Sequence, residues 1–252
     1  MTLKDRIIVI TGAARGLGRS FAEACGKAGA KHIIIADIRS DLGEETATAL
    51  RAQGMSAEFQ HVDLGDPNSI SAFAKALEQT HGHIDGLVNN GAIATGIGGK
   101  TFEEIDVETW DLVMQVNVRG LWLMVKAMAP LLRKSKLGGR IVNVASDTAL
   151  WGAPRLLHYV GSKGAVISMT RSLARELGPD NISINAIAPG LVLVEATEYV
   201  PQERKDLYIN GRAIQRAQHP QDTVGVVSFL LSNDAGFVTG QVIPINGGFV
   251  FN

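Results

Sequence analysis

The chain has 252 residues, 46% of them hydrophobic, and its 24 Lys and Arg side chains nearly balance 25 Asp and Glu. A net charge of −1 offers no attraction to nucleic acid or anionic lipid, and no segment approaches the ~18 unbroken apolar residues of a membrane span. The apolar run before Gly12 is too short for a signal peptide, and a single cysteine, Cys25, excludes an intramolecular disulfide framework. These features predict a cytoplasmic enzyme or binding domain that contacts neither nucleic acid nor a membrane.

Short β-branched runs alternate with longer helical patterns along the chain. Several runs are apolar at consecutive positions, which is typical of strands covered by helices on both faces. Strands separated by helices of this length favour right-handed crossovers, so the sequence predicts one α/β domain over residues 1–252 with a Rossmann-type, doubly wound parallel sheet. The expected strands are Ile7–Thr11, His32–Ala36, Ala57–Val62, Gly86–Asn89, Arg140–Ala145, Ile182–Ala188 and Gln241–Ile245. The expected helices are Leu17–Ala28, Leu42–Ala52, Ser69–His81, Val107–Lys134, Leu156–Leu177 and Gln221–Leu231.

Two segments interrupt this regular pattern. Pro130 lies inside the longest expected helix, which it should end or kink because proline removes a backbone donor. Residues 190–219 show no clear periodicity, and a loop of that length in a compact domain is usually functional. We therefore expect residues 190–219 to form a lid on the substrate side.

A glycine-rich turn, TGAARGLG at residues 11–18, follows the first expected strand and precedes a helix. Glycine lets the backbone bend tightly and approach a ligand, while the free N–H groups of the helix point at a phosphate. The alternative is a turn that needs glycine for its conformation alone. The turn predicts a dinucleotide site that includes Gly12, Arg15, Gly16, Leu17 and Gly18.

Asp37 closes the second expected strand, where an acidic side chain can accept hydrogen bonds from both ribose hydroxyls of an adenosine. A carboxylate there also repels a 2′-phosphate. The alternative for Asp37 is a helix N-cap, and Arg15 or Arg39 could pair with a 2′-phosphate instead. We expect the carboxylate to outweigh the two arginines, which predicts NAD rather than NADP.

Tyr159 and Lys163 lie four positions apart on an expected helix, so their side chains share one face. A nearby cation lowers the pKa of a phenol, as general acid–base work on an alcohol requires. The pair alone is weak support, since such a spacing also arises by chance.

Polar side chains follow two other strands at the same expected edge. Ser146 comes after the run Arg140–Ala145, and Asn89-Asn90-Gly91-Ala92 ends another strand, with Asn117 in the helix beyond it. Ligands bind at this edge of parallel sheets. A capping serine and structural asparagines are the alternatives.

Six histidines raise the question of a metal site. His81 and His83 fall at an expected helix end, no carboxylate follows them at a ligand spacing, and there is no second cysteine. The attraction of a cation to a helix C-terminus accounts for the pair, and we expect no metal.

Together these motifs resemble the short-chain dehydrogenase/reductase family over nearly the whole chain. The matching elements are T-G-A-A-R-G-L-G at residues 11–18, Asp37, Asp63-Leu64, N-N-G-A at residues 89–92, Asn117, Ser146, Y-V-G-S-K at residues 159–163 and Pro189-Gly190. The resemblance implies a seven-stranded sheet in the order 3-2-1-4-5-6-7, one nicotinamide dinucleotide per subunit and a homotetramer.

The resemblance also implies a role for each matching residue. Tyr159 exchanges a proton with the substrate oxygen, Lys163 depresses the pKa of Tyr159 and binds the nicotinamide ribose, and Ser146 polarises the same oxygen. Asn117 positions water in a proton relay that reaches Lys163. The remaining cofactor contacts implied are Asp63, Leu64, Asn90, Ala92, Pro189, Gly190 and Val192. Val194 departs from the family pattern, which often has Thr there, and Thr197 is displaced by three.

The function expected is oxidation of a small secondary alcohol, or reduction of its ketone, with NAD. A mixed aliphatic and aromatic wall (Trp151, Leu156, Leu191, Val194 and Tyr199) favours a cyclic or aromatic substrate. Two alternatives stay open: a 3-oxoacyl carrier-protein reductase and a protein that binds NAD without turnover. The presence of all four expected catalytic residues disfavours the binding-only protein.

Overall fold

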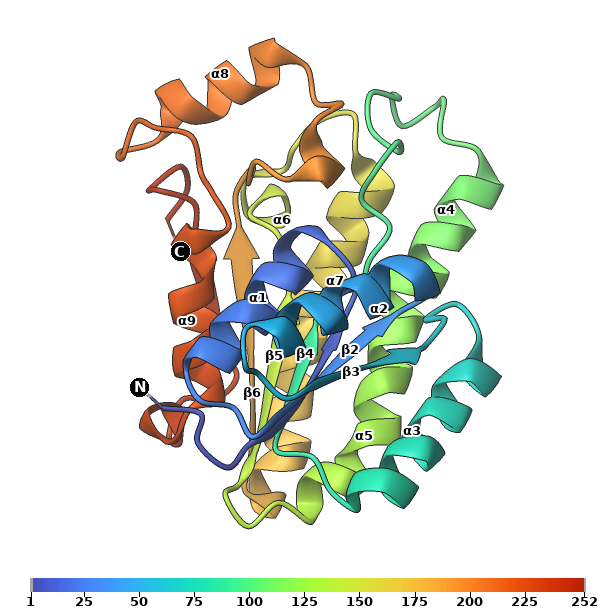
Figure 1. Cartoon of the computed structure of the whole chain (residues 1–252). Coiled ribbons are helices and arrows are strands. Elements are labelled where there is room, and N and C mark those ends of the chain that lie inside the picture. The colour runs from blue at the N-terminus through green and yellow to red at the C-terminus, as the bar shows by residue number, and fades with distance from the viewer. Residues whose placement is uncertain (1, 252) are drawn as a thin grey trace.

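The structure, a computed structural model, describes residues 2–251. It contains a parallel seven-stranded sheet in the order β3-β2-β1-β4-β5-β6-β7, which confirms the predicted topology (Figure 1). Every expected strand is present within two residues of its predicted ends. The strands are β1 (Ile7–Thr11), β2 (His32–Asp37), β3 (Ala57–His61), β4 (Gly86–Asn89), β5 (Gly139–Val144), β6 (Ile182–Pro189) and β7 (Val242–Ile245).

Helices cover both faces of the sheet (Figure 1). One face carries α1 (Gly16–Lys27), α2 (Ser40–Ala52) and α9 (Gln221–Leu231), and the other carries α3 (Pro67–His81), α5 (Leu121–Arg133) and α7 (Leu157–Leu177). The shorter helices α4 (Val107–Met114), α6 (Thr148–Trp151) and α8 (Gln202–Gly211) lie toward the carboxyl edge of the sheet (Figure 1). Within residues 2–251, no helix is long and apolar enough to cross a membrane.

The consecutive apolar residues of the strands divide between two separate cores. Ile8 of β1 packs in the core that includes Phe21 of α1 and Leu231 of α9. Its neighbour Val9 packs in the opposite core, with Leu77 of α3. Because successive strand residues point to opposite faces, a run that is apolar at every position buries side chains under both helix layers.

The helix expected over Val107–Lys134 is interrupted, which the sequence pattern does not reveal. A π-helical turn at Gln115–Gly120 separates α4 from α5. Pro130 does not end α5, which continues to Arg133. Proline costs α5 the one hydrogen bond to the carbonyl oxygen of Lys126, and the buried Leu131 and Leu132 hold the last turn against the core.

Residues 190–219 are not the structureless loop that the sequence predicts. They contain a short 3₁₀ turn at Glu195–Thr197 and the helix α8. Tyr208 is the buried residue of α8, so the helix has no apolar stripe of the kind that marks an amphipathic helix. Hydrophobic periodicity in the sequence therefore does not predict this helix.

Candidate active site

A cleft of about 1970 Å³ opens at the carboxyl edge of the sheet. It is larger than the ~300–1,000 Å³ of ordinary ligand pockets, so it has room for a dinucleotide together with a substrate. Parallel strands end at the same edge, which is why residues far apart in the sequence meet there. The expected site residues that line the cleft are Gly12, Arg15, Gly16, Leu17, Asp37, Asp63, Leu64, Asn90, Ala92, Ser146, Tyr159, Lys163, Pro189, Gly190 and Val192.

Two glycines of the turn after β1 are packed too closely to be replaced by any other residue. Gly12 has φ +62°, a left-handed conformation, and a Cβ on it would lie 2.6 Å from Cα of Gly91. A Cβ on Gly18 would overlap the carbonyl oxygen of Gly12, so Gly18 supports the turn from behind. The amide of Asn90 donates to the carbonyl oxygens of Thr11 and Gly12 at 3.0 Å each, which ties the turn to the end of β4.

The N-terminus of α1 opens onto the same cleft. The helix begins at Gly16, and Arg15, the residue before it, makes no side-chain hydrogen bond to the first turn. The first N–H groups of a helix have no partner within the helix and attract anions. The close-packed glycines and this helix end fit the pyrophosphate of a dinucleotide.

Asp37 is buried at the end of β2, next to the glycine turn. Its Oδ2 accepts a hydrogen bond from the N–H of Ala14 at 3.0 Å, and its Oδ1 accepts one from the N–H of Arg39 at 3.0 Å. The Arg39 side chain lies 3.5 Å from Oδ1. Two backbone donors thus orient the carboxylate, and they leave lone pairs for ribose hydroxyls.

Ser146, Tyr159 and Lys163 converge on the opposite part of the cleft. Ser146 follows β5, and its Oγ accepts hydrogen bonds from the N–H and the hydroxyl of Thr148, at 3.3 and 2.9 Å. Tyr159 and Lys163 lie on one face of α7, with Nζ 5.6 Å from the centre of the phenol ring. Lys163 also donates to the carbonyl oxygen of Val144 at 2.7 Å, which anchors the ammonium to the end of β5.

Burial dominates the electrostatics of this trio. It raises the pKa of Tyr159 to about 12, with Asp147 and Tyr199 adding to the rise and hydrogen bonding to Ser146 opposing it. It lowers the pKa of Lys163 to about 8. The resemblance implies a depressed pKa for Tyr159, and among the residues of this chain the shift has the opposite direction. A further positive charge near the phenol is needed to form phenolate at neutral pH.

Asn117 lies behind the cleft wall, in the π-helical turn. Its side chain accepts a hydrogen bond from the N–H of Ile93 at 2.7 Å and donates to the carbonyl oxygen of Ile93 at 3.0 Å. It also donates to Ser162 at 3.2 Å, and Ser162 in turn donates to the carbonyl oxygen of Tyr159 at 2.7 Å. Asn117 therefore connects the loop after β4 to α7 through its side chain. The proton relay implied by the resemblance stays a prediction.

An aromatic group that the sequence does not predict holds the lid helix α8. Tyr208 donates to Oδ1 of Asp147 at 3.1 Å and stacks on Phe249 with ring centres 4.6 Å apart. Trp151 donates to the Tyr208 hydroxyl at 3.3 Å, so it lies behind Tyr208 and not in the wall where the sequence places it. These residues come from distant parts of the chain, and no local pattern relates them.

The lid also reaches across the cleft to the loop after β4. Tyr199 donates to the carbonyl oxygen of Ala94 at 2.9 Å. Thr197 folds back within the lid, where its hydroxyl lies 2.7 Å from the carbonyl oxygen of Val192 and accepts from the N–H of Val194 at 3.0 Å. Val194 and Thr197 both line the cleft, so the displaced threonine occupies the same stretch of wall.

Comparison with known proteins agrees with this arrangement. A family model described as enoyl-(acyl carrier protein) reductase matches residues 12–250. Cyclopentanol dehydrogenase from Comamonas sp. (strain NCIMB 9872) is 32% identical, with 99% of both chains covered. The 3-oxoacyl-[acyl-carrier-protein] reductase of Thermotoga maritima is also 32% identical, covering 99% of this chain and 100% of its own.

Solved structures share the fold. A gluconate 5-dehydrogenase from Burkholderia cenocepacia J2315, in complex with NADP and tartrate, has a TM-score of 0.91 and 27% identity. The alignment covers 98% of this chain and 96% of that one. With its sheet order, its cleft and full-length relatives, the chain belongs to the short-chain dehydrogenase/reductase family of oxidoreductases.

Proposed function

We propose that the protein interconverts a small secondary alcohol and its ketone with NAD(H). The observation that carries this proposal is the convergence of Ser146, Tyr159 and Lys163 at one part of a cleft whose other part is lined by the glycine turn and Asp37. An acid–base group and a dinucleotide site in one cavity are what oxidation of an alcohol requires.

Tyr159 is the proton-transfer residue in this proposal. Its Oη takes the proton of the substrate hydroxyl during oxidation and returns it to the carbonyl oxygen during reduction. Ser146 lies at the end of β5 with its Oγ oriented by Thr148, and it donates to the same substrate oxygen. Hydrogen bonds from the hydroxyls of Tyr159 and Ser146 to one substrate oxygen fix the reacting carbon within the cleft.

Lys163 supplies positive charge to the phenol and holds the ribose next to the reacting ring. Its ammonium is fixed by the carbonyl oxygen of Val144, 2.7 Å away, and its pKa of about 8 keeps a substantial fraction charged at neutral pH. A bound oxidised nicotinamide would accept hydride and would add the second positive charge that the raised pKa of Tyr159 calls for.

The preference for NAD rests on Asp37. Its buried carboxylate, held by two backbone N–H groups, suits ribose hydroxyls and opposes a 2′-phosphate. Arg39 favours the phosphate, and the Burkholderia relative binds NADP. The carboxylate is the more buried of the two groups, so its charge is less screened, and we infer that it decides the choice.

A cyclic or aromatic secondary alcohol suits the substrate part of the cleft best. Leu156, Tyr199, Leu207 and Tyr208 give this part apolar and aromatic surface, next to polar lid residues such as Glu203 and Arg204. Similarity to a cyclopentanol dehydrogenase supports the same class. Similarity to the Thermotoga reductase supports 3-oxoacyl reduction as the second candidate.

The test is NADH formation, followed by absorbance, with purified protein and a panel of cyclic, aromatic, linear and sugar alcohols. NADP is run in parallel, and 3-oxoacyl thioesters with NADPH test the second candidate. Turnover of cyclic alcohols with NAD supports the proposal. Faster turnover of the thioesters with NADPH favours the reductase instead, and NAD binding without any turnover favours the binding-only protein.

A further inference from the structure

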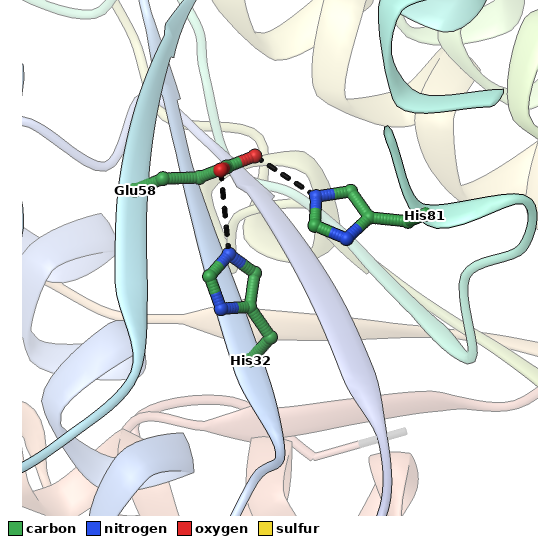
Figure 2. A group of neighbouring side chains, drawn as sticks. All are labelled: His32, Glu58 and His81. Carbon is green, nitrogen blue, oxygen red and sulfur yellow. Dashed lines mark hydrogen bonds and ion pairs between the residues drawn. The ribbon is translucent and has the colours of Figure 1, made fainter. Parts of the chain in front are cut away.

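Two histidines and a glutamate meet at the edge of the sheet opposite the cleft (Figure 2). His32 is the first residue of β2, Glu58 belongs to the edge strand β3, and His81 is the last residue of α3. One ligand atom from each lies within 4.8 Å of the other two. In the sequence His81 is next but one to His83, but His83 pairs with Asp85 at 3.5 Å, and the fold places Glu58 and His32 beside His81.

The carboxylate of Glu58 bridges the two imidazole rings unequally. Its Oε1 accepts hydrogen bonds from Nε2 of His81 at 2.9 Å and from the amide of Gln60 at 2.8 Å. Its Oε2 faces Nε2 of His32 at 3.6 Å, which is too long for a hydrogen bond. Nε2 of His32 is buried and has no hydrogen-bond partner. Two facing polar atoms separated by this distance are suited to share an ion.

We propose that His32, Glu58 and His81 bind a divalent transition-metal ion, with Zn²⁺ as the best match. Two imidazoles and one carboxylate are a common zinc ligand set, and bonds of ~2.0–2.2 Å place tetrahedral ligand atoms roughly 3.3 Å apart. The distances from the Glu58 carboxylate to Nε2 of His81, 2.9 Å, and to Nε2 of His32, 3.6 Å, lie on either side of that value. Small side-chain movements would therefore complete the site. Half-exposed Glu58 leaves a fourth position for water.

The surroundings already orient one ligand. Nδ1 of His32 lies 2.7 Å from Oγ of Ser56, which leaves Nε2 as the nitrogen that faces Glu58. A polar partner on the second ring nitrogen is the usual support of a metal-bound imidazole. The centres of the His32 and His81 rings lie 5.0 Å apart, close enough for both nitrogens to reach one ion.

A bound ion would take no part in the alcohol chemistry, because the site lies far from the reacting groups. His32 begins β2 and Asp37 ends it, so the two edges are separated by roughly 16 Å at ~3.3 Å per residue. A bound ion would cross-link the edge strand β3 to β2 and to the end of α3. The expected effect is greater stability of the folded protein and unchanged turnover.

The test uses the full chain, stripped of metal with a chelator and titrated with Zn²⁺ and with Co²⁺. Calorimetry should give one Zn²⁺ per chain, and Co²⁺ should produce the visible absorption of a tetrahedral nitrogen and oxygen site. At a free Zn²⁺ concentration of about 100 Kd, Tm should rise by roughly 5–10 °C.

Three variants separate a built site from surface binding. His81→Gln and Glu58→Gln should each weaken Zn²⁺ binding by about tenfold or more, since even the loss of a supporting group costs that much. The matched control is His61→Ala, an exposed histidine three positions from Glu58 on the same strand, which should bind as the parent does. Cofactor-dependent turnover should be the same in all three.

The proposal is overturned if the parent protein does not bind Zn²⁺ and its Tm does not change when Zn²⁺ is added. It is equally overturned if His81→Gln and Glu58→Gln bind Zn²⁺ as tightly as the parent. Circular dichroism of the variants without metal shows whether they fold, and His32→Gln provides a third, independent ligand deletion. None of these outcomes depends on the identity of the alcohol substrate.

Discussion

The two walls of the cleft are built in different ways. The cofactor wall consists of short turns at the ends of β1 and β2, whose backbone groups are hydrogen-bonded by the side chains of Asn90 and Asp37. The lid wall consists of α8 and its flanking turns, held by side chains such as Tyr208 and Tyr199. The close packing at Gly12 and Gly18 restricts residue type within a short stretch of chain, whereas the lid depends on contacts between aromatic side chains from distant segments. The first wall therefore carries a sequence motif, and the second does not.

Tyr159→Phe should have the largest effect, because it removes the hydroxyl that transfers the proton. Turnover should fall by about 10²–10⁴-fold or more, since general acid–base catalysis is lost. The affinity for NAD, measured by fluorescence titration, should change little. Activity above a few per cent of the parent would assign proton transfer to another group.

Lys163→Met should lower kcat for alcohol oxidation by about 10²-fold and change its pH profile. Tyr159 has its pKa raised to about 12, so the phenolate fraction and the oxidation rate increase as pH rises. The increase should become shallower above pH 8, where Lys163 loses its proton. In the variant this inflection disappears and the whole profile moves to higher pH. An unchanged profile contradicts the role of Lys163.

Asp37→Ala tests the cofactor wall. Loss of hydrogen bonds to a charged group costs ~1.5–3 kcal/mol, so the Kd for NAD should rise by about 10- to 100-fold and discrimination against NADP should relax. Asp41→Ala, on the exposed first turn of α2, is the control. A parent protein that already prefers NADPH is the result that contradicts the assignment.

Tyr208→Phe tests the lid wall, where substitutions should have the smallest effects. It removes the hydrogen bond to Asp147 while keeping the stack on Phe249, so KM for the alcohol should rise by about 2- to 10-fold with the Kd for NAD unchanged. Tyr199→Phe deletes the exposed contact to Ala94 and should change KM less. An equal effect on NAD binding would show that the two walls are coupled.

The elements that a sequence predicts best are those with local causes. The seven strands follow from apolar runs, and the glycine turn follows from residues 11–18 alone. Tyr159 and Lys163 are found together because a helix places residues four apart on one face. The homotetramer implied by the resemblance stays a prediction.

The features that escape sequence reasoning depend on contacts between distant segments. The residue types of the π-helical turn at Gln115–Gly120 do not distinguish it from the helices on either side, and α8 has no apolar stripe. The raised pKa of Tyr159 arises from burial, which the positions of residues along the sequence do not reveal. The group of His32, Glu58 and His81 exists only because β2 and β3 begin where α3 ends.

The strand order has a consequence for synthesis of the chain on the ribosome. β1 lies inside the sheet, third from the β3 edge, and Ile8 pairs with Gly86 of β4. Gly86 leaves the ribosome roughly 4–15 s after Ile8 at ~5–20 residues per second. Until then, one edge of a strand that is apolar except for Thr11 has no neighbour, and such an edge promotes aggregation. Substitutions that delay the docking of β4 should therefore reduce the yield of soluble protein more than they reduce the stability of the finished fold.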